Sequence, residues 1–205
     1  PVLKAWGSDY ALKANDHAIQ IHGGYGYTRE YPVEQCWRDN RINPIHEGTN
    51  GIQALDLLGR KAVMQDGAAL RLLLGEIAGT TTAARANAGL ATLAAELDAL
   101  AETTARTTMA AAQRMAAGEA RRVLANAPHY MTLVGHLVIG WCWLRQALAA
   151  EPLLGRGPAD VAFAQGKLQA CRWFFANELP IARAAARLVA EADDTAYAMQ
   201  PDWFG

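Results

Sequence analysis

The chain has 205 residues and a formal net charge of −1 at pH 7. Apolar residues make up 52% of it and charged residues 19%, a balance that is typical of a globular protein and excludes a disordered chain. The nearly neutral charge gives no support to nucleic acid or an anionic membrane surface as a partner. The length allows one large domain or two small ones.

The residue types favour an all-α fold in a reducing compartment. Alanine, the best helix former, is common throughout, whereas β-branched residues are sparse. The three cysteines are odd in number and too few for a disulfide framework, and Cys142 and Cys171 lie in apolar stretches typical of buried thiols. We therefore expect a cytoplasmic protein with reduced cysteines.

The chain opens on helical apolar spacing with no capping residue before it. Residues 1–10 lack the basic segment and apolar core of a signal peptide. A chain that starts inside a helix predicts that these 205 residues belong to something longer. The apolar residues that follow the helical spacing are Val2, Leu3, Trp6, Tyr10, Leu12 and Ala14.

Residues 22–28, His-Gly-Gly-Tyr-Gly-Tyr-Thr, follow this first helix. A dinucleotide-binding fingerprint needs G-x-G-x-x-G between a strand and a helix, and neither condition is met. Gly23 and Gly24 permit either a helix stop in a left-handed conformation or a close approach of the backbone to a ligand. The residues alone leave both interpretations open, and a helix stop is the commoner one.

A further helix is expected over residues 52–61, with Thr49 or Asn50 as its N-cap. Glu47 therefore precedes a helix N-terminus, where free backbone N–H groups favour anions and polar ligand atoms. A zinc-protease interpretation of His46 and Glu47 fails, because that motif needs a second histidine four residues after the first. On these grounds Glu47 is either a structural carboxylate, the commoner case, or a catalyst.

The character of the chain changes near residue 65. Residues 1–65 are mixed in composition and contain several glycine breaks, whereas residues 66–205 are rich in alanine and have long helical periods, so we predict two domains with this boundary. Residues 133–144 are the most apolar stretch. They are fewer than the roughly 20 residues that span a bilayer, which favours a core helix.

The first helix of the second domain is predicted over residues 68–77. Asp66 is its expected N-cap, because a short acidic side chain accepts from the free N–H groups at a helix start. Gly79 and the threonine run at residues 80–82 are expected to end or interrupt this helix.

Three longer amphipathic helices follow, and with the first they suit an antiparallel four-helix bundle. Gly118 separates the first of these from the second, and Pro180 is expected to kink the third. No metal site is predicted, because the chain lacks the Glu-x-x-His pairs of di-metal bundles and neither His129 nor His136 has a carboxylate at ligand spacing. The predicted core positions are Leu90, Leu93, Leu97, Leu100, Tyr130, Val134, Leu137, Trp141, Leu144, Leu148, Leu168, Cys171, Phe175, Leu179 and Ala182.

Taken together, residues 20–53 resemble the C-terminal catalytic segment of the acyl-CoA dehydrogenase family of flavoenzymes. In that family a helix ending in Gln-Ile-x-Gly-Gly-x-Gly-Tyr precedes an Arg-Asp helix, a Glu-Gly-Thr loop and an Ile-Gln helix start. The layout from about residue 66 resembles the extra C-terminal helical domain of longer members, similar to methylthiopropionyl-CoA dehydrogenase-like enzymes. The matching residues are Gln20, Ile21, Gly23, Gly24, Gly26, Tyr27, Tyr31, Pro32, Glu34, Arg38, Asp39, Ile45, Glu47, Gly48, Thr49, Ile52 and Gln53.

This resemblance implies the FAD-dependent α,β-dehydrogenation of an acyl-CoA thioester to a trans-2-enoyl-CoA. Glu47 matches the base that removes the α-proton, while the β-hydrogen leaves as hydride to the flavin N5. A dry pocket strengthens a carboxylate as a base. The backbone N–H of Glu47 is expected to bind the thioester oxygen, and Gly48 lets the substrate pass close by.

The same resemblance implies cofactor contacts and partners. The residues that match the FAD-contacting loop are Thr49, Asn50 and Gly51. Those that match the stretch holding the ADP part of FAD, in this family often from the neighbouring subunit, are Gln20, Gly23 and Gly24. Electrons are expected to pass to an electron-transfer flavoprotein, and the protein is expected to be a homo-oligomer. Two positions depart from the family pattern, since His46 replaces the tyrosine of many members and Gly51 offers the flavin no side chain.

The sequence contains no β-rich region, although family members carry an N-terminal helical domain and a middle β-domain that cover the flavin. We therefore expect a C-terminal part of an acyl-CoA dehydrogenase that is inactive alone, binds FAD weakly or not at all, and self-associates through apolar surface on residues 1–65. The alternative is a stand-alone helical interaction or assembly module without catalysis of its own.

Overall fold

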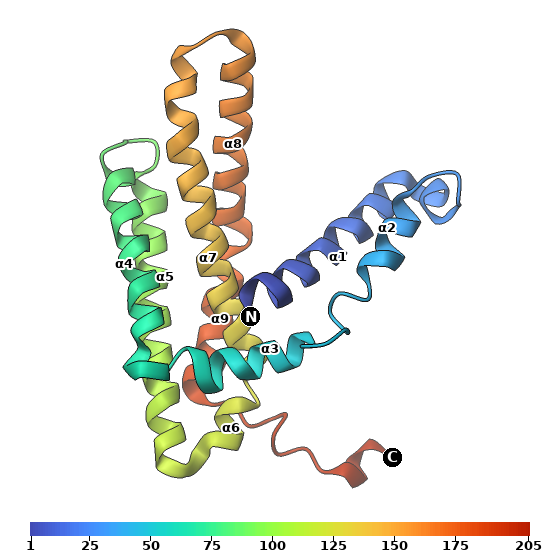
Figure 1. The fold of residues 1–205 in the computed structure, drawn as a ribbon, viewed down its shortest axis with the longest axis vertical. Helices are drawn as coiled ribbons and strands as arrows, with labels where there is room; N and C mark the ends of the chain where they lie inside the picture. Colours follow the sequence, from blue (N-terminus) through green and yellow to red (C-terminus); the bar gives the residue numbers. More distant parts are fainter.

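The structure, a computed structural model, describes residues 1–205, and all its regular elements are helical, as predicted. Figure 1 shows an upright bundle of long helices and an arm that leaves it sideways. The arm consists of α1 (Val2–His22), the short turn η1 (Gly23–Tyr27) and α2 (Val33–Asn40). The chain then returns to the bundle through α3 (Asn50–Asp56) and the π turn η2 (Leu57–Lys61).

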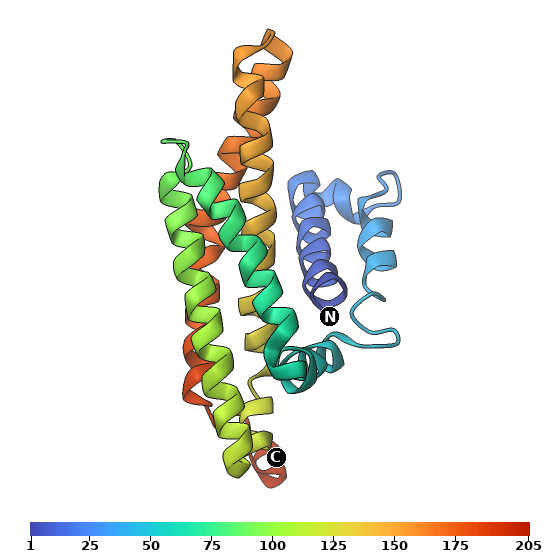
Figure 2. The same ribbon diagram turned by 60° about the vertical axis from the view of Figure 1, so that its left-hand side comes forward.

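Four long helical segments form the bundle, which confirms the predicted architecture. α4 packs along α5, while α7 packs along α8 and α9, which follow one another as the fourth segment. The α7–α8 hairpin extends beyond the end of the α4–α5 pair (Figure 2). The remaining elements are α4 (Met64–Arg85), α5 (Ala91–Arg114), η3 (Met115–Glu119), α6 (Ala120–Leu124), α7 (Ala127–Ala150), η4 (Glu151–Gly155), α8 (Pro158–Asn177), α9 (Leu179–Glu191) and η5 (Pro201–Phe204).

The start of α4 differs from the prediction. Gln65, Asp66 and Gly67 have positive φ angles of 51°, 54° and 78°, so the chain makes a left-handed turn before the regular helix begins. Asp66 is therefore not the N-cap, because a capping residue has an extended backbone, and no side-chain hydrogen bond caps this helix. The guanidinium of Arg71 donates to the Asp66 carbonyl and helps to hold the turn.

The expected break at Gly79 and the threonine run is wrong, because α4 continues through them. The Thr80 hydroxyl accepts a hydrogen bond from Trp141 Nε1 of α7 at 2.7 Å, and the Thr81 hydroxyl donates to the Asp98 carboxylate of α5 at 2.7 Å. Contacts with neighbouring helices thus satisfy the hydroxyls and outweigh the low helix propensity of these residues.

The breaks at Gly118 and Pro180 take different forms. Gly118 has a φ of +95° after α5, which confirms the predicted break. Pro180 does not kink a continuous helix. It lies in the first turn of α9, one residue after Leu179, where proline needs no helical N–H partner, and α8 has already ended at Asn177.

One continuous core joins the base of the arm to the bundle. A cluster of 29 buried residues includes Ala5 of α1 and Ala54 of α3 together with bundle side chains such as Tyr130. Gly135 of α7 permits this contact, since a Cβ there would lie 2.1 Å from Trp6 Cδ1. The division into two domains at residue 65 stays a prediction.

The helix that contains the most apolar stretch is longer than the sequence suggests. The helical segment Ala127–Gly155 has 29 residues, and its most apolar 18-residue window has a mean hydropathy of 1.2, so by length and composition alone it could cross a membrane. Residues 133–144 are therefore part of a longer apolar helix, and their number does not by itself exclude a membrane span. However, 50% of the most apolar window is buried within the protein, and this burial supports the assignment as a core helix.

Candidate active-site segment

The glycine turn at the end of α1 stops the helix, which is the commoner of the two interpretations that the sequence leaves open. Gly23 has φ 60° and ψ −141°, a conformation that a side chain disfavours, and its N–H donates to the Gln20 carbonyl. Gly26 is required by packing, because a Cβ there would lie 2.5 Å from the Ile19 carbonyl oxygen. A Cβ at Gly23 or Gly24 would instead meet nothing within 4 Å, so these two glycines face open space.

The loop before α3 carries Glu47 and is closed by its own backbone. The Asn50 N–H donates to the Pro44 carbonyl at 3.1 Å, and between them Gly48 has a φ of +74°. This positive φ strains any residue with a side chain, and a Cβ on Gly48 would lie 2.6 Å from Gln53 Nε2, so the loop backbone favours glycine there. The Glu47 side chain is exposed and makes no hydrogen bond or ion pair, and its backbone N–H has no backbone acceptor.

Thr49 is the N-cap of α3, one of the two residues expected there. Thr49 occupies the N-cap position, but its hydroxyl makes no capping hydrogen bond to the helix. This hydroxyl is therefore available to other partners. A Cβ at Gly51 would meet nothing within 4 Å, so the first turn of α3 also borders open space. His46, like Glu47, is exposed.

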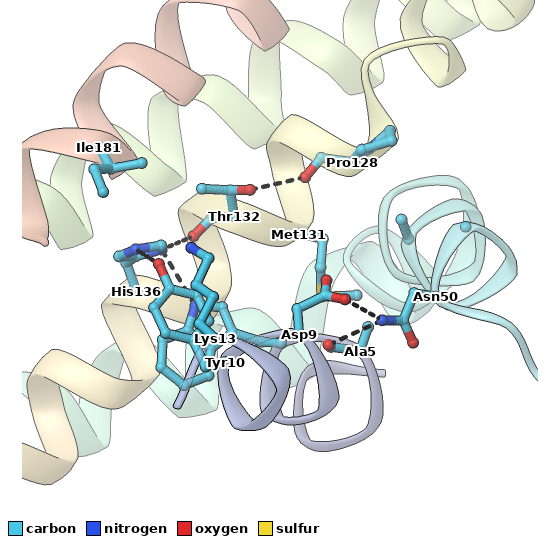
Figure 3. A pocket seen from close by; sticks show the side chains of 13 residues that line it. Ala5, Asp9, Tyr10, Lys13, Asn50, Pro128, Met131, Thr132, His136 and Ile181 are labelled. Carbon is cyan, nitrogen blue, oxygen red and sulfur yellow. Dashed lines mark hydrogen bonds between the residues drawn. The ribbon is translucent and has the colours of Figure 1, made fainter. Parts of the chain in front are cut away.

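The Asn50 side chain points at α1 (Figure 3). Its Nδ2 lies 2.7 Å from Asp9 Oδ1, 3.0 Å from Ser8 Oγ and 3.2 Å from the Ala5 carbonyl. Its Oδ1 accepts from Lys4 Nζ at 3.4 Å. The amide is therefore already paired within the chain, and the expected contact of Asn50 with FAD stays a prediction.

A cavity of about 490 Å³ lies beside this contact (Figure 3). Asn50 and Gly51 line it from α3, together with residues of α1. Residues of α7, among them Thr132, form the opposite wall, and Ile181 contributes from α9. The bundle therefore shares a cavity with the segment that carries the predicted flavin loop.

His136 joins α1 to the bundle at this cavity, and its side chain is only 1% exposed. Its Nδ1 lies 2.7 Å from the Thr132 carbonyl, which can only accept, so Nδ1 carries the proton in the neutral ring and Nε2 is an acceptor. The Tyr10 hydroxyl lies 2.7 Å from Nε2 and 2.9 Å from Glu178 Oε2, and it has one proton for these two acceptors. Trp6 stacks on Tyr10 with ring centroids 3.7 Å apart.

The surroundings shift both titratable groups towards their uncharged forms. Burial lowers the pKa of the His136 imidazole, against the opposing effect of the Thr132 carbonyl and the Glu178 carboxylate. Burial and the hydrogen bond to Glu178 raise the pKa of the Tyr10 phenol. Near neutral pH the link between α1 and α7 thus consists of an uncharged imidazole and an uncharged phenol.

The structure does not bring the two sets of predicted flavin contacts together within one chain. Asn50 and Gly51 lie against the first half of α1, near Asp9, whereas Gln20 and Gly23 lie at its far end (Figure 1). From Asp9 to Gln20 a helix rises about 16 Å at 1.5 Å per residue. The two sets therefore face different surroundings. This is compatible with the family resemblance, which implies that Gln20, Gly23 and Gly24 contact the FAD of a neighbouring subunit.

Sequence reasoning misses the connection among Tyr10, His136 and Glu178. The available signal is a histidine inside an apolar helix, which needs hydrogen-bond partners once it is buried. Those partners come from α1 and from the α8–α9 junction, so only the tertiary structure identifies them. The structure contains no group of three or more histidine, cysteine, aspartate or glutamate side chains arranged to hold a metal ion.

Two family models match the chain. One is described as "Acyl-CoA dehydrogenase, C-terminal domain" and matches residues 1–63, which contain the glycine turn and the Glu47 loop. The other is described as "Acetyl-CoA dehydrogenase C-terminal like" and matches residues 73–200, more than half of the chain. The chain belongs to the acyl-CoA dehydrogenase family. This confirms the resemblance inferred from residues 20–53.

Similar members of the acyl-CoA dehydrogenase family are larger. The chain is 31% identical to a broad-specificity linear acyl-CoA dehydrogenase of Mycobacterium tuberculosis, over 95% of the chain and 33% of that relative. It is 35% identical to the 3-methylmercaptopropionyl-CoA dehydrogenase of Ruegeria pomeroyi, over 82% of the chain and 28% of that relative. The chain thus spans about a third of the length of these relatives.

A solved structure shares the fold. It is an acyl-CoA dehydrogenase complexed with FAD from Bacillus anthracis, and the similarity covers 92% of the chain and 32% of that protein. The TM-score is 0.67 and the sequence identity is 23%. The all-α arrangement described above is therefore one that this family adopts.

Proposed function

We propose that the chain is the C-terminal catalytic part of an FAD-dependent acyl-CoA dehydrogenase, with Glu47 as the base that removes the α-proton of an acyl-CoA thioester. The observation that carries this proposal is a free carboxylate on a loop that the backbone closes from Pro44 to Asn50. A general base must reach the proton it takes, and an ion pair within the chain would weaken it as a base. The Glu47 side chain is exposed and has no ion pair within the chain, and both features support this role.

The backbone around Glu47 supports a second role in the same reaction. The N–H of Glu47 has no backbone acceptor, so it is free to donate to the thioester carbonyl oxygen as negative charge develops there. The absence of a side chain on Gly48 leaves room for the substrate to pass beside the loop. One short segment thus provides both the base and a donor that acidifies the α-carbon.

The residues proposed to hold FAD fit a ligand that approaches the backbone closely. A Cβ on Gly23, Gly24 or Gly51 would meet nothing within 4 Å, and Thr49 is exposed. These residues would hold FAD, which when bound would supply the acceptor for the hydride from the β-carbon and so allow the trans-2-enoyl-CoA to form. The proposed cofactor-binding residues are Gln20, Gly23, Gly24, Thr49, Asn50 and Gly51.

We also propose the partners of the whole protein. Acyl-CoA is the substrate and an electron-transfer flavoprotein is the acceptor, as the family resemblance implies. A homo-oligomer is supported by large exposed apolar side chains on the arm, such as Ile21 and Tyr27. The cysteines Cys36, Cys142 and Cys171 are all free, which supports a reducing compartment such as the cytoplasm.

The test is the bleaching of bound flavin by acyl-CoA, measured on the chain joined to the flavin-covering part of the longer protein. Glu47→Gln should abolish bleaching while FAD stays bound, because the amide cannot accept the α-proton. The matched control is Glu30→Gln, another exposed glutamate in the same segment, which should leave bleaching unchanged. Full bleaching in the Glu47→Gln variant would contradict the assignment of the base. An absence of bleaching in every variant, the wild type included, would favour the stand-alone module.

A further inference from the structure

Asn50 connects the Glu47 loop to the rest of the molecule in two ways. Its backbone N–H donates to the Pro44 carbonyl at 3.1 Å and closes the loop. Its side-chain amide donates to Asp9 Oδ1 of α1 at 2.7 Å. Glu47 lies between Pro44 and Asn50 and has no side-chain partner, so only the backbone of this loop determines where its carboxylate stands.

We propose that Asn50 is a positioning residue, which fixes the place of Glu47 relative to α1 and the bundle through its contact with Asp9. The inference rests on the proposed function, because it matters for catalysis only if Glu47 is the base. Asn50 need not touch the substrate for this role. A displacement of a base by about 1 Å is enough to lower a rate strongly, which makes the anchor of a loop as important as its tip.

The bundle takes part in the same arrangement through α1. Tyr10, the residue after Asp9 in α1, holds this helix against α7 and the α8–α9 junction. Its hydroxyl lies within hydrogen-bond distance of both His136 and Glu178. Contacts thus run from the bundle through α1 to the Asn50 side chain (Figure 3). The backbone N–H of Asn50 then closes the Glu47 loop. The helical region after residue 65 thus has a role in this proposal, because it fixes the position of α1 and, through α1 and Asn50, that of the loop that carries the base.

A charge exchange between the two contacting residues tests the proposal on the 205-residue chain. Asn50→Asp replaces the donor amide by a carboxylate that faces the Asp9 carboxylate, so it both removes a hydrogen bond and adds repulsion. It leaves α3 itself favourable, since an acidic residue suits the first turn of a helix. The matched variant is Asp9→Asn combined with Asn50→Asp, which again sets an amide opposite a carboxylate.

The measurement is hydrogen exchange of the backbone amides of Asn50 and Gln53, whose acceptors are the Pro44 and Thr49 carbonyls. In Asn50→Asp we expect exchange there to be about tenfold faster, the factor that corresponds to about 1.4 kcal/mol, and close to wild type in the double variant. Amides in α8 should not change. If Asn50→Asp does not fold, recovery of folding and of slow exchange in the double variant supports the proposal.

Two results would overturn the inference: wild-type exchange in Asn50→Asp, or a double variant that does not recover. The proposed function is tested separately by flavin reduction in the complete protein. There, Asn50→Asp should lower kcat far more than it raises KM, and the double variant should restore kcat. Rapid flavin reduction in Glu47→Gln would overturn the proposed function alone and leave the exchange result standing.

Discussion

Gly135 determines how closely α1 approaches α7. A Cβ at this position would lie 2.1 Å from Trp6 Cδ1, and the Trp6 ring has little freedom to move because it stacks on Tyr10. Gly135→Ala should therefore lower the free energy of unfolding by about 1–3 kcal/mol, as overpacking does, despite the better helix propensity of alanine.

Urea unfolding measures this effect, and Gly166→Ala in α8 is the matched control. Gly166 is an exposed helical glycine, and a Cβ there would meet nothing within 4 Å. Alanine at that position should be neutral or stabilising by up to about 1 kcal/mol. Equal effects of the two substitutions would contradict the packing described for Trp6.

Local features of the active-site segment could be predicted from the sequence, and distant ones could not. The helix stop at Gly23, and an N-cap at either Thr49 or Asn50, follow from residue type and neighbours along the chain. The partner of Asn50 does not, because Asp9 is 41 positions away and no pattern within the loop points to it. The exposure of Glu47 likewise depends on which parts of the protein cover the loop.

At the scale of elements, the contact of α1 with α7 makes stability depend on pH. Burial lowers the pKa of His136 below its ordinary value of 6.5, so the unfolded chain binds this proton more tightly than the folded one. The stability that the neutral imidazole contributes is present above pH 6.5 and is lost as the pH falls through the folded pKa. The charged and titratable groups around the ring are Glu178, Tyr10 and Lys13.

Urea unfolding at about pH 7.5 and about pH 5.5 should therefore show a smaller loss of stability on acidification in His136→Gln than in the wild type. His129→Gln is the matched control, because His129 lies seven residues away on the same helix but is exposed. It should keep the wild-type dependence. An identical loss in all three proteins would mean that His136 does not titrate with folding.

Long apolar periods predict the bundle well, since the spacing of residues such as Leu97, Leu137 and Phe175 reflects burial that the fold confirms. Helix limits are less predictable. α4 passes through its threonine run because Trp141 and Asp98, on other helices, satisfy the hydroxyls. Its left-handed start at residues 65–67 has no sequence signal beyond one glycine.

At the scale of the molecule, the arm exposes several large apolar side chains. Leu3, Ile21 and Tyr27 are 87%, 83% and 87% exposed. The 205-residue chain should therefore self-associate, and light scattering should give a mass above 22.1 kDa. Glutamate at these three positions should restore the monomer.

The control places glutamate at Met109 and Phe163 of the bundle, which are 63% and 59% exposed. These substitutions should not change the mass, because the association is expected on the arm. A monodisperse monomer of the unmodified chain would contradict this prediction.

The central claim is that this chain supplies the base of a dehydrogenase, and the measurement that tests it most directly is exchange of the acyl-CoA α-proton with heavy water. Exchange depends on proton removal alone and is independent of hydride transfer and of the electron acceptor. In the chain joined to the rest of the longer protein, Glu47→Gln should slow this exchange by about 10²–10⁴-fold, the usual contribution of a general base. Unchanged exchange in that variant, with FAD and acyl-CoA still bound, would contradict the account.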